Sequence, residues 1–312
     1  MASFASQALV RAADTLLPQI AADLAVSVGA ASIVITAYAL THGSMQFITG
    51  PIADGFGKYR TVALACALSA VTVAACGLAQ SLDSLTLARF VSGLTVAWIL
   101  PISLAFIGDV VPYEQRQQVL GRFLAGQVLG QLFGQAAGGI VGDFFGWRTM
   151  FLLLAAMLAV AAVALGWQLA ANPMTRPARG AAERRGLVAS YRIVLGTPWA
   201  RVMLIAVGFE GTFFQGVFSY IGADLHLRFG LSFTGVGVVI GIFAFGGLIY
   251  AATVKVLMRR LGQTGIARSG GVLIGLSFLT LALQPVWYFA PLAMLGVGVG
   301  FYMLHNTLQT EA

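Results

Sequence analysis

Long apolar stretches alternate with short polar ones along the whole chain. They predict ten membrane-spanning helices, near residues 3–22, 31–49, 61–79, 85–107, 118–141, 148–170, 199–221, 232–256, 268–284 and 286–308. About 20 apolar residues are enough for a helix to cross a hydrocarbon core of roughly 30 Å. Backbone amides in lipid must be hydrogen-bonded internally, and the sequence lacks the strict alternation of a membrane barrel. The pattern therefore predicts an all-α polytopic membrane protein.

Composition supports this prediction and excludes several functions. Of the 312 residues, 59% are hydrophobic and 9% are charged, whereas soluble domains carry roughly 25% charged residues. His42, His226 and His305 are scattered without metal-ligand spacing, and the sequence contains neither a phosphate-binding loop nor a G-x-S-x-G nucleophile elbow. We therefore predict no enzyme activity, no cofactor and no metal.

Basic residues are divided unevenly between the two sets of loops. One set contains only Arg148 and Arg228. The other set contains Lys58, Arg60, Arg116, Arg122, Arg176, Arg179, Arg184, Arg185, Arg192, Arg201, Lys255, Arg259, Arg260 and Arg268. Because cytoplasmic loops are enriched in Lys and Arg, we expect the amino terminus and the central loop to be cytoplasmic in the inner (plasma) membrane. Topology then accounts for the net charge of +7, and no nucleic-acid partner is predicted.

A polar segment divides the chain into two lobes. We expect a six-helix N-terminal lobe over residues 1–170, a cytoplasmic linker over 171–198 and a four-helix C-terminal lobe over 199–312. The second lobe echoes the first, because Arg259-Arg260-Leu261-Gly262 lies in the position that Asp54-Gly55-Phe56-Gly57 occupies in the first. Two lobes related in this way are typical of transporters built from parallel repeats.

The polar loop between the second and third spans carries a family signature. It reads Gly50-Pro-Ile-Ala-Asp-Gly-Phe-Gly-Lys-Tyr-Arg60 and resembles the G-x-x-x-D-x-x-G-[RK]-x-[RK] motif of the major facilitator superfamily through Gly50, Asp54, Gly57, Lys58 and Arg60. The resemblance implies that Asp54 helps to hold a cytoplasmic gate closed, partly through helix eleven. Gly55 replaces the usual basic residue, which puts that role in doubt, and a solvated turn carboxylate is the alternative.

Because complete members of this family have two more helices, the resemblance implies that the chain is truncated after its tenth span. A genuine ten-helix protein is the alternative.

Further motifs resemble the drug:proton antiporter branch of that family. Asp14-Thr-Leu-Leu-Pro18 looks like the first-helix motif D-x-x-x-x-P-x-x-A, with the alanine displaced to Ala21. Leu85-Thr-Leu-Ala-Arg89-Phe-Val-Ser-Gly93 resembles the helix-four motif l-x-x-x-R-x-x-q-G, with Ser92 at the glutamine position. The resemblance implies a role for Arg89 in proton coupling; snorkelling to the outer interface is the alternative.

A glycine series in the fifth span resembles the helix-five antiporter motif. It consists of Gly126, Gly130, Gly134, Gly138 and Gly139, and Gln135 stands where antiporters have proline. Four-residue spacing places these glycines on one slowly rotating stripe, so that another helix can approach closely. With Gly93 they form the predicted helix-packing set, and generic small-residue packing explains the stripe equally well.

Ionisable residues inside spans are the first candidate functional residues. Arg11 and Asp14 lie at i and i+3 on one helix face, so they form either a structural ion pair or a carboxyl that titrates. Glu210 lies about nine residues into its span with no cation within one turn, so we expect it to be protonated, to face water or to be a neutral structural group. Further candidates for polar lining of a cavity are Tyr38, Gln46, Gln215, Tyr220, Tyr302, His305 and Asn306.

Together these features predict a monomeric secondary transporter that moves a small molecule across the lipid bilayer by alternating access. Proton-coupled efflux of a drug or metabolite is the first interpretation. The alternatives are a proton-independent or importing facilitator of a sugar or metabolite, and a non-transporting membrane sensor or assembly protein.

Overall fold

The computed structural model describes residues 1–172, 175, 192 and 194–311; the side chains of 50–55, 113, 114, 117, 118, 121, 124 and 309–311 lie outside this description. Within it all regular structure is helical, which confirms the predicted fold class. The chain divides into two compact units, unit 1 (Met1–Arg184) and unit 2 (Arg185–Ala312).

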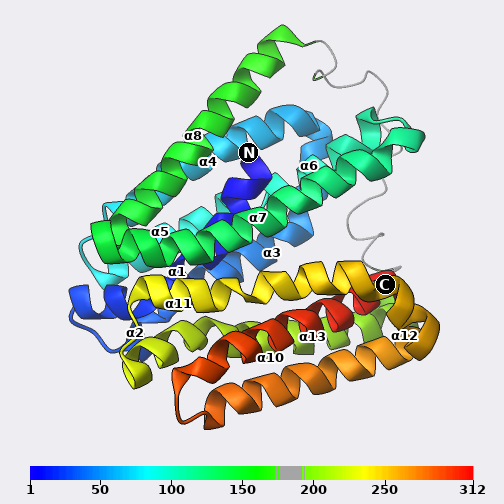
Figure 1. Ribbon diagram of the computed structural model, residues 1–312. Coiled ribbons are helices and arrows are strands. Elements are labelled where there is room, and N and C mark those ends of the chain that lie inside the picture. Colours follow the sequence, from blue (N-terminus) through cyan, green and yellow to red (C-terminus); the bar gives the residue numbers. More distant parts are fainter. Residues whose placement is uncertain (173–174, 176–191, 193, 312) are drawn as a thin grey trace. The chain divides into compact units, whose positions relative to one another are not determined.

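Unit 1 is a helical bundle built around its first helix. Its elements are α1 (Ala2–Asp23), α2 (Val28–Ala31), α3 (Ile33–Phe56), α4 (Lys58–Gly77), α5 (Leu82–Val96), α6 (Ile99–Val110), α7 (Tyr113–Phe145) and α8 (Trp147–Ala171). The helix α1 contacts α2, α3, α6, α7 and α8 (Figure 1). Sixteen consecutive or near-consecutive positions of α1 from Ser3 to Ala21 are therefore buried, polar ones included.

Glycines allow α7 to lie directly against α1. A Cβ atom on Gly130 would clash with the Phe4 carbonyl oxygen and lie 2.9 Å from the Phe4 Cα; one on Gly134 would meet Ala8 in the same way, again 2.9 Å from its Cα. At Gly126, by contrast, an added Cβ would make only an ordinary contact at 3.8 Å. Close backbone approach supplies van der Waals contact where lipid offers no hydrophobic driving force between helices.

Other members of the predicted packing set lie at similar contacts. A Cβ on Gly138 would lie 2.7 Å from Thr15 Oγ1, and Gly139 is buried on the same helix. Gly93 of α5 faces α3, where a Cβ would lie 2.6 Å from the Tyr38 carbonyl oxygen.

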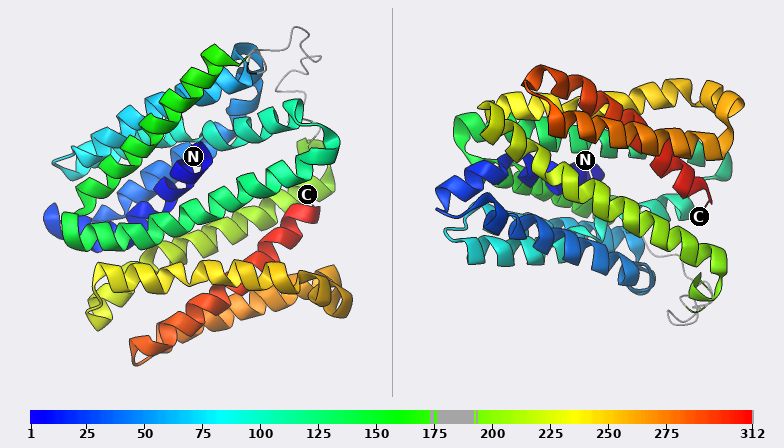
Figure 2. Two further views of the ribbon diagram at one scale, coloured as in Figure 1. Left: turned by 45° about the horizontal axis from the view of Figure 1, so that its top comes forward. Right: turned by 90° about the horizontal axis from the view of Figure 1, so that it is seen from below.

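Unit 2 is arranged around its last helix. Its elements are α10 (Pro198–Phe229), α11 (Phe233–Gly241), α12 (Phe243–Leu283), the short 3-10 helix η2 (Trp287–Phe289) and α13 (Ala290–Glu311). The chain reverses direction within α12 at Gly262, whose φ of 64° is left-handed and favours glycine. Figures 1 and 2 show the two halves of α12 running out and back. Both halves pack on α13, where Gly298 meets Phe243 and Gly300 meets Gly270.

Seven helical runs of the described chain are long and apolar enough to cross a membrane. The ten predicted spans differ from this number for physical reasons. Arg11 and Asp14 in α1, and a series of glutamines in α7, lower the hydropathy of these two helices. The run Phe233–Leu283 counts once, although its chain reverses at Gly262.

The predicted polar loop at residues 50–60 is wrong in extent. The helix α3 continues to Phe56, and α4 begins at Lys58. Only Gly57 breaks the two helices, with a φ of 88° that an L side chain rarely adopts. Polar residues were taken as a loop, but the turn needs a single glycine.

The α1–α7 contact gives a first prediction. We expect Gly134→Ala to lower the melting temperature of the detergent-purified protein by roughly 2–8 °C, because forcing a methyl group into a packed contact costs about 1–3 kcal/mol. Gly126→Ala is the matched control on the same helix, and its melting temperature should be unchanged or higher, since alanine favours a helix. Equal melting temperatures for the two variants would contradict the close approach at Gly134.

Candidate functional site

Unit 1 buries an ion pair within α1. Arg11 Nη1 lies 3.2 Å from Asp14 Oδ2, and the two side chains are 8% and 2% exposed. One helical turn separates them, so the helix itself brings the charges together. Because α1 is enclosed by other helices, the pair is removed from lipid.

A second guanidinium, that of Arg89 on α5, is completely buried in unit 1. Its Nε donates a hydrogen bond to the Val34 carbonyl oxygen at 3.2 Å, and its Cζ lies 4.0 Å from the centre of the Tyr38 ring. Nη1 and Nη2 have no hydrogen-bond partner among the described residues. Asp14 is close enough to act on Arg89 electrostatically. Full burial rules out the snorkelling alternative.

Two aromatic residues of α3 extend this cluster. The rings of Tyr38 and His42 stack with centroids 5.3 Å apart, and Tyr38 is buried while His42 is half-buried. Gln46, one turn further along α3, is exposed. The structure therefore joins Tyr38 to Arg89 but leaves Gln46 outside the cluster. His42 was not among the predicted site residues, although its spacing of four from Tyr38 places both on one helix face.

Unit 2 contains a carboxylate–imidazole pair. His305 Nδ1 of α13 lies 3.0 Å from both carboxylate oxygens of Glu210 on α10. The Glu210 side chain is 6% exposed and that of His305 is 30% exposed. The expectation that Glu210 has no cationic partner is therefore wrong, because it considered only neighbours on the same helix. The Phe301 ring stacks on the imidazole, with centroids 4.9 Å apart.

The remaining lining candidates in unit 2 are dispersed. Tyr302 packs against Gly247, where an added Cβ would lie 2.6 Å from the phenol ring. Asn306 follows His305 on α13 and is half-buried. Gln215 and Tyr220 are exposed on α10.

At the predicted cytoplasmic end of unit 1, an ion pair joins two loops that resemble family motifs. Lys58 Nζ at the start of α4 lies 2.6 Å from Asp109 Oδ2 near the end of α6. Arg116 Nη2 donates to the Gly108 carbonyl oxygen at 2.7 Å. Arg60 is exposed. The side chains at positions 50 and 54, Gly50 and Asp54 of the gate motif, lie outside the described residues.

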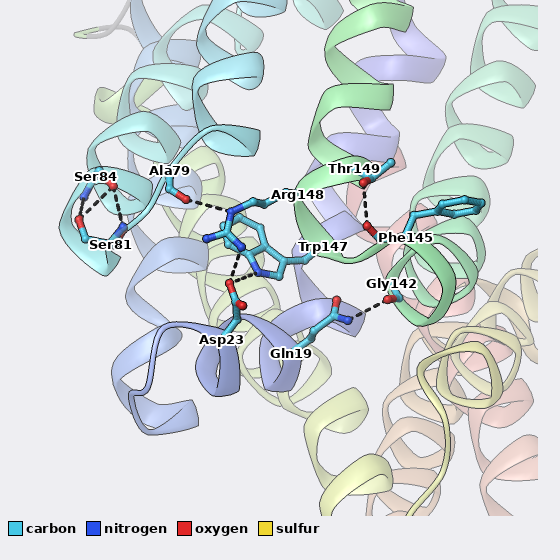
Figure 3. Close-up of polar contacts among 10 residues, drawn as sticks. All are labelled: Gln19, Asp23, Ala79, Ser81, Ser84, Gly142, Phe145, Trp147, Arg148 and Thr149. Carbon is cyan, nitrogen blue, oxygen red and sulfur yellow. Dashed lines mark hydrogen bonds and ion pairs between the residues drawn. The ribbon is translucent and has the colours of Figure 1, made fainter.

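A polar clamp that the sequence analysis missed ties together the opposite end of unit 1 (Figure 3). Asp23 Oδ2 at the end of α1 accepts hydrogen bonds from Arg148 Nη1 and, at 3.1 Å, from Trp147 Nε1. Arg148 Nε also donates to the Ala79 carbonyl oxygen at 3.2 Å. Three helix ends therefore meet at one carboxylate. The signal in the sequence was Asp23 directly after the first span and an aromatic–arginine dipeptide before the sixth.

The environment of Asp23 affects its protonation. The residue lies beyond the predicted span 3–22. Hydrogen bonds from Arg148 and then from Trp147 hold its pKa below the ordinary value of 3.8, because both donors favour the charged carboxylate.

Two helical units with ionisable groups buried in their helices define a membrane carrier of parallel-repeat design. A family model described as the Major Facilitator Superfamily matches residues 1–311, and the chain belongs to this family. It is therefore a transporter and not an enzyme.

Similar sequences include transporters from several bacteria. The chain is 26% identical over 301 residues to the uncharacterized MFS-type transporter YceJ of Bacillus subtilis, covering 95% of this chain and 76% of that protein. It is 27% identical over 192 residues to the multidrug export protein EmrB of Haemophilus influenzae, covering 62% of this chain and 37% of that protein. A lincomycin resistance protein of Streptomyces lincolnensis is 31% identical over 135 residues, 42% of this chain and 27% of that protein.

Solved structures share the fold. An inward-facing, unoccupied bacterial homolog of the human lysosomal transporter Spinster gives a TM-score of 0.76 at 18% identity, covering 99% of this chain and 72% of that one. The nucleoside transporter NupG gives 0.73 at 14% identity, with 99% and 79% covered. At these identities the likeness concerns the fold alone.

The Asp23 clamp predicts a pH-dependent stability. A carboxyl whose pKa is lowered by folding contributes stability above its unfolded pKa of about 3.9, and this contribution is lost as the pH falls through the folded pKa. We expect Asp23→Asn to lower the melting temperature slightly at pH 7, since half-exposed ion pairs contribute about 0–1 kcal/mol. The difference from the wild type should shrink as the pH falls toward 3.

Asp83→Asn is the matched control, because Asp83 is an exposed carboxylate of the same unit. A difference between wild type and Asp23→Asn that stays constant over this pH range would contradict the assignment.

Proposed function

We propose that this transporter exports drug-like or metabolite small molecules across the inner membrane in exchange for protons, and that it belongs to the drug:proton antiporter branch. The observation that carries the proposal is the burial of ionisable side chains, Asp14 and Arg89 in unit 1 and Glu210 in unit 2, inside apolar helical bundles. Likeness to a multidrug export protein and to a lincomycin resistance protein supports efflux.

The energetic cost of these charges supports a functional role. A charged residue at the centre of a membrane helix costs about 2.5–3.5 kcal/mol on insertion scales. Packing alone would favour apolar residues of similar size at such positions. Proton exchange, by contrast, requires a group inside the helices that can change its charge. The motifs around Asp14, Arg89 and the α7 glycines support the antiporter branch, whereas Gln135 departs from it.

The proposed mechanism is alternating access, in which unit 1 rocks against unit 2. A proton that binds from the acidic outside to Asp14 or Glu210 would release the substrate, and loss of the proton to the cytoplasm would permit rebinding. Tyr38, Gln46, Gln215, Tyr220, Tyr302, His305 and Asn306 are the proposed polar contacts of the substrate. The Lys58–Asp109 pair, together with Asp54, would stabilise the closed cytoplasmic side. We place the amino terminus and the central segment in the cytoplasm and propose a monomer.

Purified protein in liposomes tests the proposal, with lincomycin and the fluorescent cation ethidium as probes. We expect an acidic lumen to accelerate accumulation of at least one probe, because protons leaving the lumen drive its entry. The double variant Asp14→Asn/Glu210→Gln should lose this acceleration, since neither carboxyl can then bind a proton. Probe fluorescence or radiolabel retained on filters measures both.

Asp83→Asn, which alters an exposed carboxylate outside the proposed site, should transport as the wild type does. Flux that runs equally with and without a pH gradient would indicate the facilitator alternative. Unaltered gradient-driven flux in the double variant would remove both carboxyls from coupling.

A further inference from the structure

The two buried carboxylates have opposite charge surroundings. In unit 1, Asp14 is 3.2 Å from Arg11 and also interacts electrostatically with Arg89. One carboxylate thus faces two guanidinium groups, and the buried cluster carries a net charge of one positive unit. Nearby cations favour the ionised form of a carboxylate.

Protonation of Asp14 would leave both arginines without a counter-charge. Arg89 is fully buried, and its Nη1 and Nη2 already lack hydrogen bonds among the described residues. Removing one partner of a buried ion pair costs about 3–5 kcal/mol. Asp14 is therefore suited to remain an anion that holds α1 and α5 together electrostatically.

In unit 2 the balance is reversed. Glu210 faces an imidazole, which is neutral in one state and cationic in the other. With neutral His305 the pair has one negative charge, and with one bound proton it has none. His305 Nδ1 is 3.0 Å from each Glu210 oxygen, so a proton on that nitrogen points at both. His305 is the more exposed partner and thus the one that water reaches.

The other charged groups of the surrounding helices leave this pair to itself. Asp224 of α10 lies 3.8 Å from Arg228, near the helix end. On α12, Lys255 and Arg268 are exposed, and α11 carries no ionisable residue. Further groups on the same helices are Arg201, His226, Tyr220, Tyr250, Arg259, Arg260 and Tyr302. Among the described residues of unit 2, no second carboxylate or imidazole contacts the Glu210–His305 pair.

We propose that the Glu210–His305 pair, and not Asp14, carries the coupling proton; this inference rests on the function proposed above. On the outside, a proton from water forms an N–H bond with His305 Nδ1, and the charge of the pair changes from negative to zero. The proton is shared with the carboxylate of Glu210. On the inside the same bond breaks, the proton returns to water, and the negative charge is restored.

Two measurements on the same proteoliposomes test this assignment with lincomycin and ethidium. One is accumulation driven by an acidic lumen, and the other is exchange of labelled for unlabelled probe without a gradient. We expect Glu210→Gln and His305→Gln to retain exchange but to lose stimulation by the gradient. Exchange should also lose its pH dependence in these variants. Glu210→Asp, which keeps a carboxylate, should recover part of the stimulation.

Asp14→Asn should behave differently. Its exchange rate is expected to fall, because the arginines lose their counter-charge, but the ratio of gradient-driven to gradient-free transport should match that of the wild type. Loss of this ratio in Asp14→Asn, or its retention in both Glu210→Gln and His305→Gln, would overturn the inference while leaving proton-coupled efflux intact.

Absence of any gradient effect in the wild type would instead refute the proposed function. If Glu210→Gln shows no exchange because it misfolds, His305→Gln decides the outcome, since its amide can still donate a hydrogen bond to Glu210.

Discussion

Charges placed inside helices that face lipid must be neutralised within the bundle that contains them, and this constraint organises both units. Arg11 and Asp14 satisfy it locally, one turn apart on α1. Glu210 satisfies it across helices, through His305 on α13. Arg89 satisfies it least completely, with one backbone hydrogen bond, the face of Tyr38 and the more distant Asp14. The helices that hold these residues are consequently the central ones, α1 in unit 1 and α13 in unit 2, because only there can lipid be excluded.

Close approach of helix backbones makes that burial possible. Gly93 follows Arg89 by one turn on α5, and its missing side chain allows α5 to contact the Tyr38 backbone. The guanidinium of Arg89 then lies over the Tyr38 ring, a contact worth about 2 kcal/mol when desolvated. In unit 2, Gly298 and Gly300 hold α13 against both halves of α12. The glycines therefore determine which side chains meet, although they take no part in the chemistry.

Local rules succeeded where the relevant neighbours are close in sequence. Hydropathy predicted the helices, and the spacing of Arg11 and Asp14 predicted a shared face. Those rules could not find His305 as the partner of Glu210, since 95 residues separate them and no single sequence shows which helices pack together. The clamp at Asp23 was missed for the same reason. The extent of α3 was underestimated because polar residues near Asp54 suggested a loop, whereas a helix end in water accepts polar residues and only Gly57 needs an unusual backbone.

The separation of the two charge clusters has a consequence for any exchange of protons against a substrate. A carboxyl can act as a proton carrier only if neither of its charge states is strongly favoured. Two guanidinium groups beside Asp14 favour one state, and an imidazole beside Glu210 offers a second site to the same proton. Placing a permanent positive charge in unit 1 and a variable charge in unit 2 keeps the arginines from suppressing protonation of the variable group. A carrier built in this way changes the charge of one unit in each cycle while the other unit keeps its packing, so that binding of a proton alters one energy rather than the stability of the whole protein.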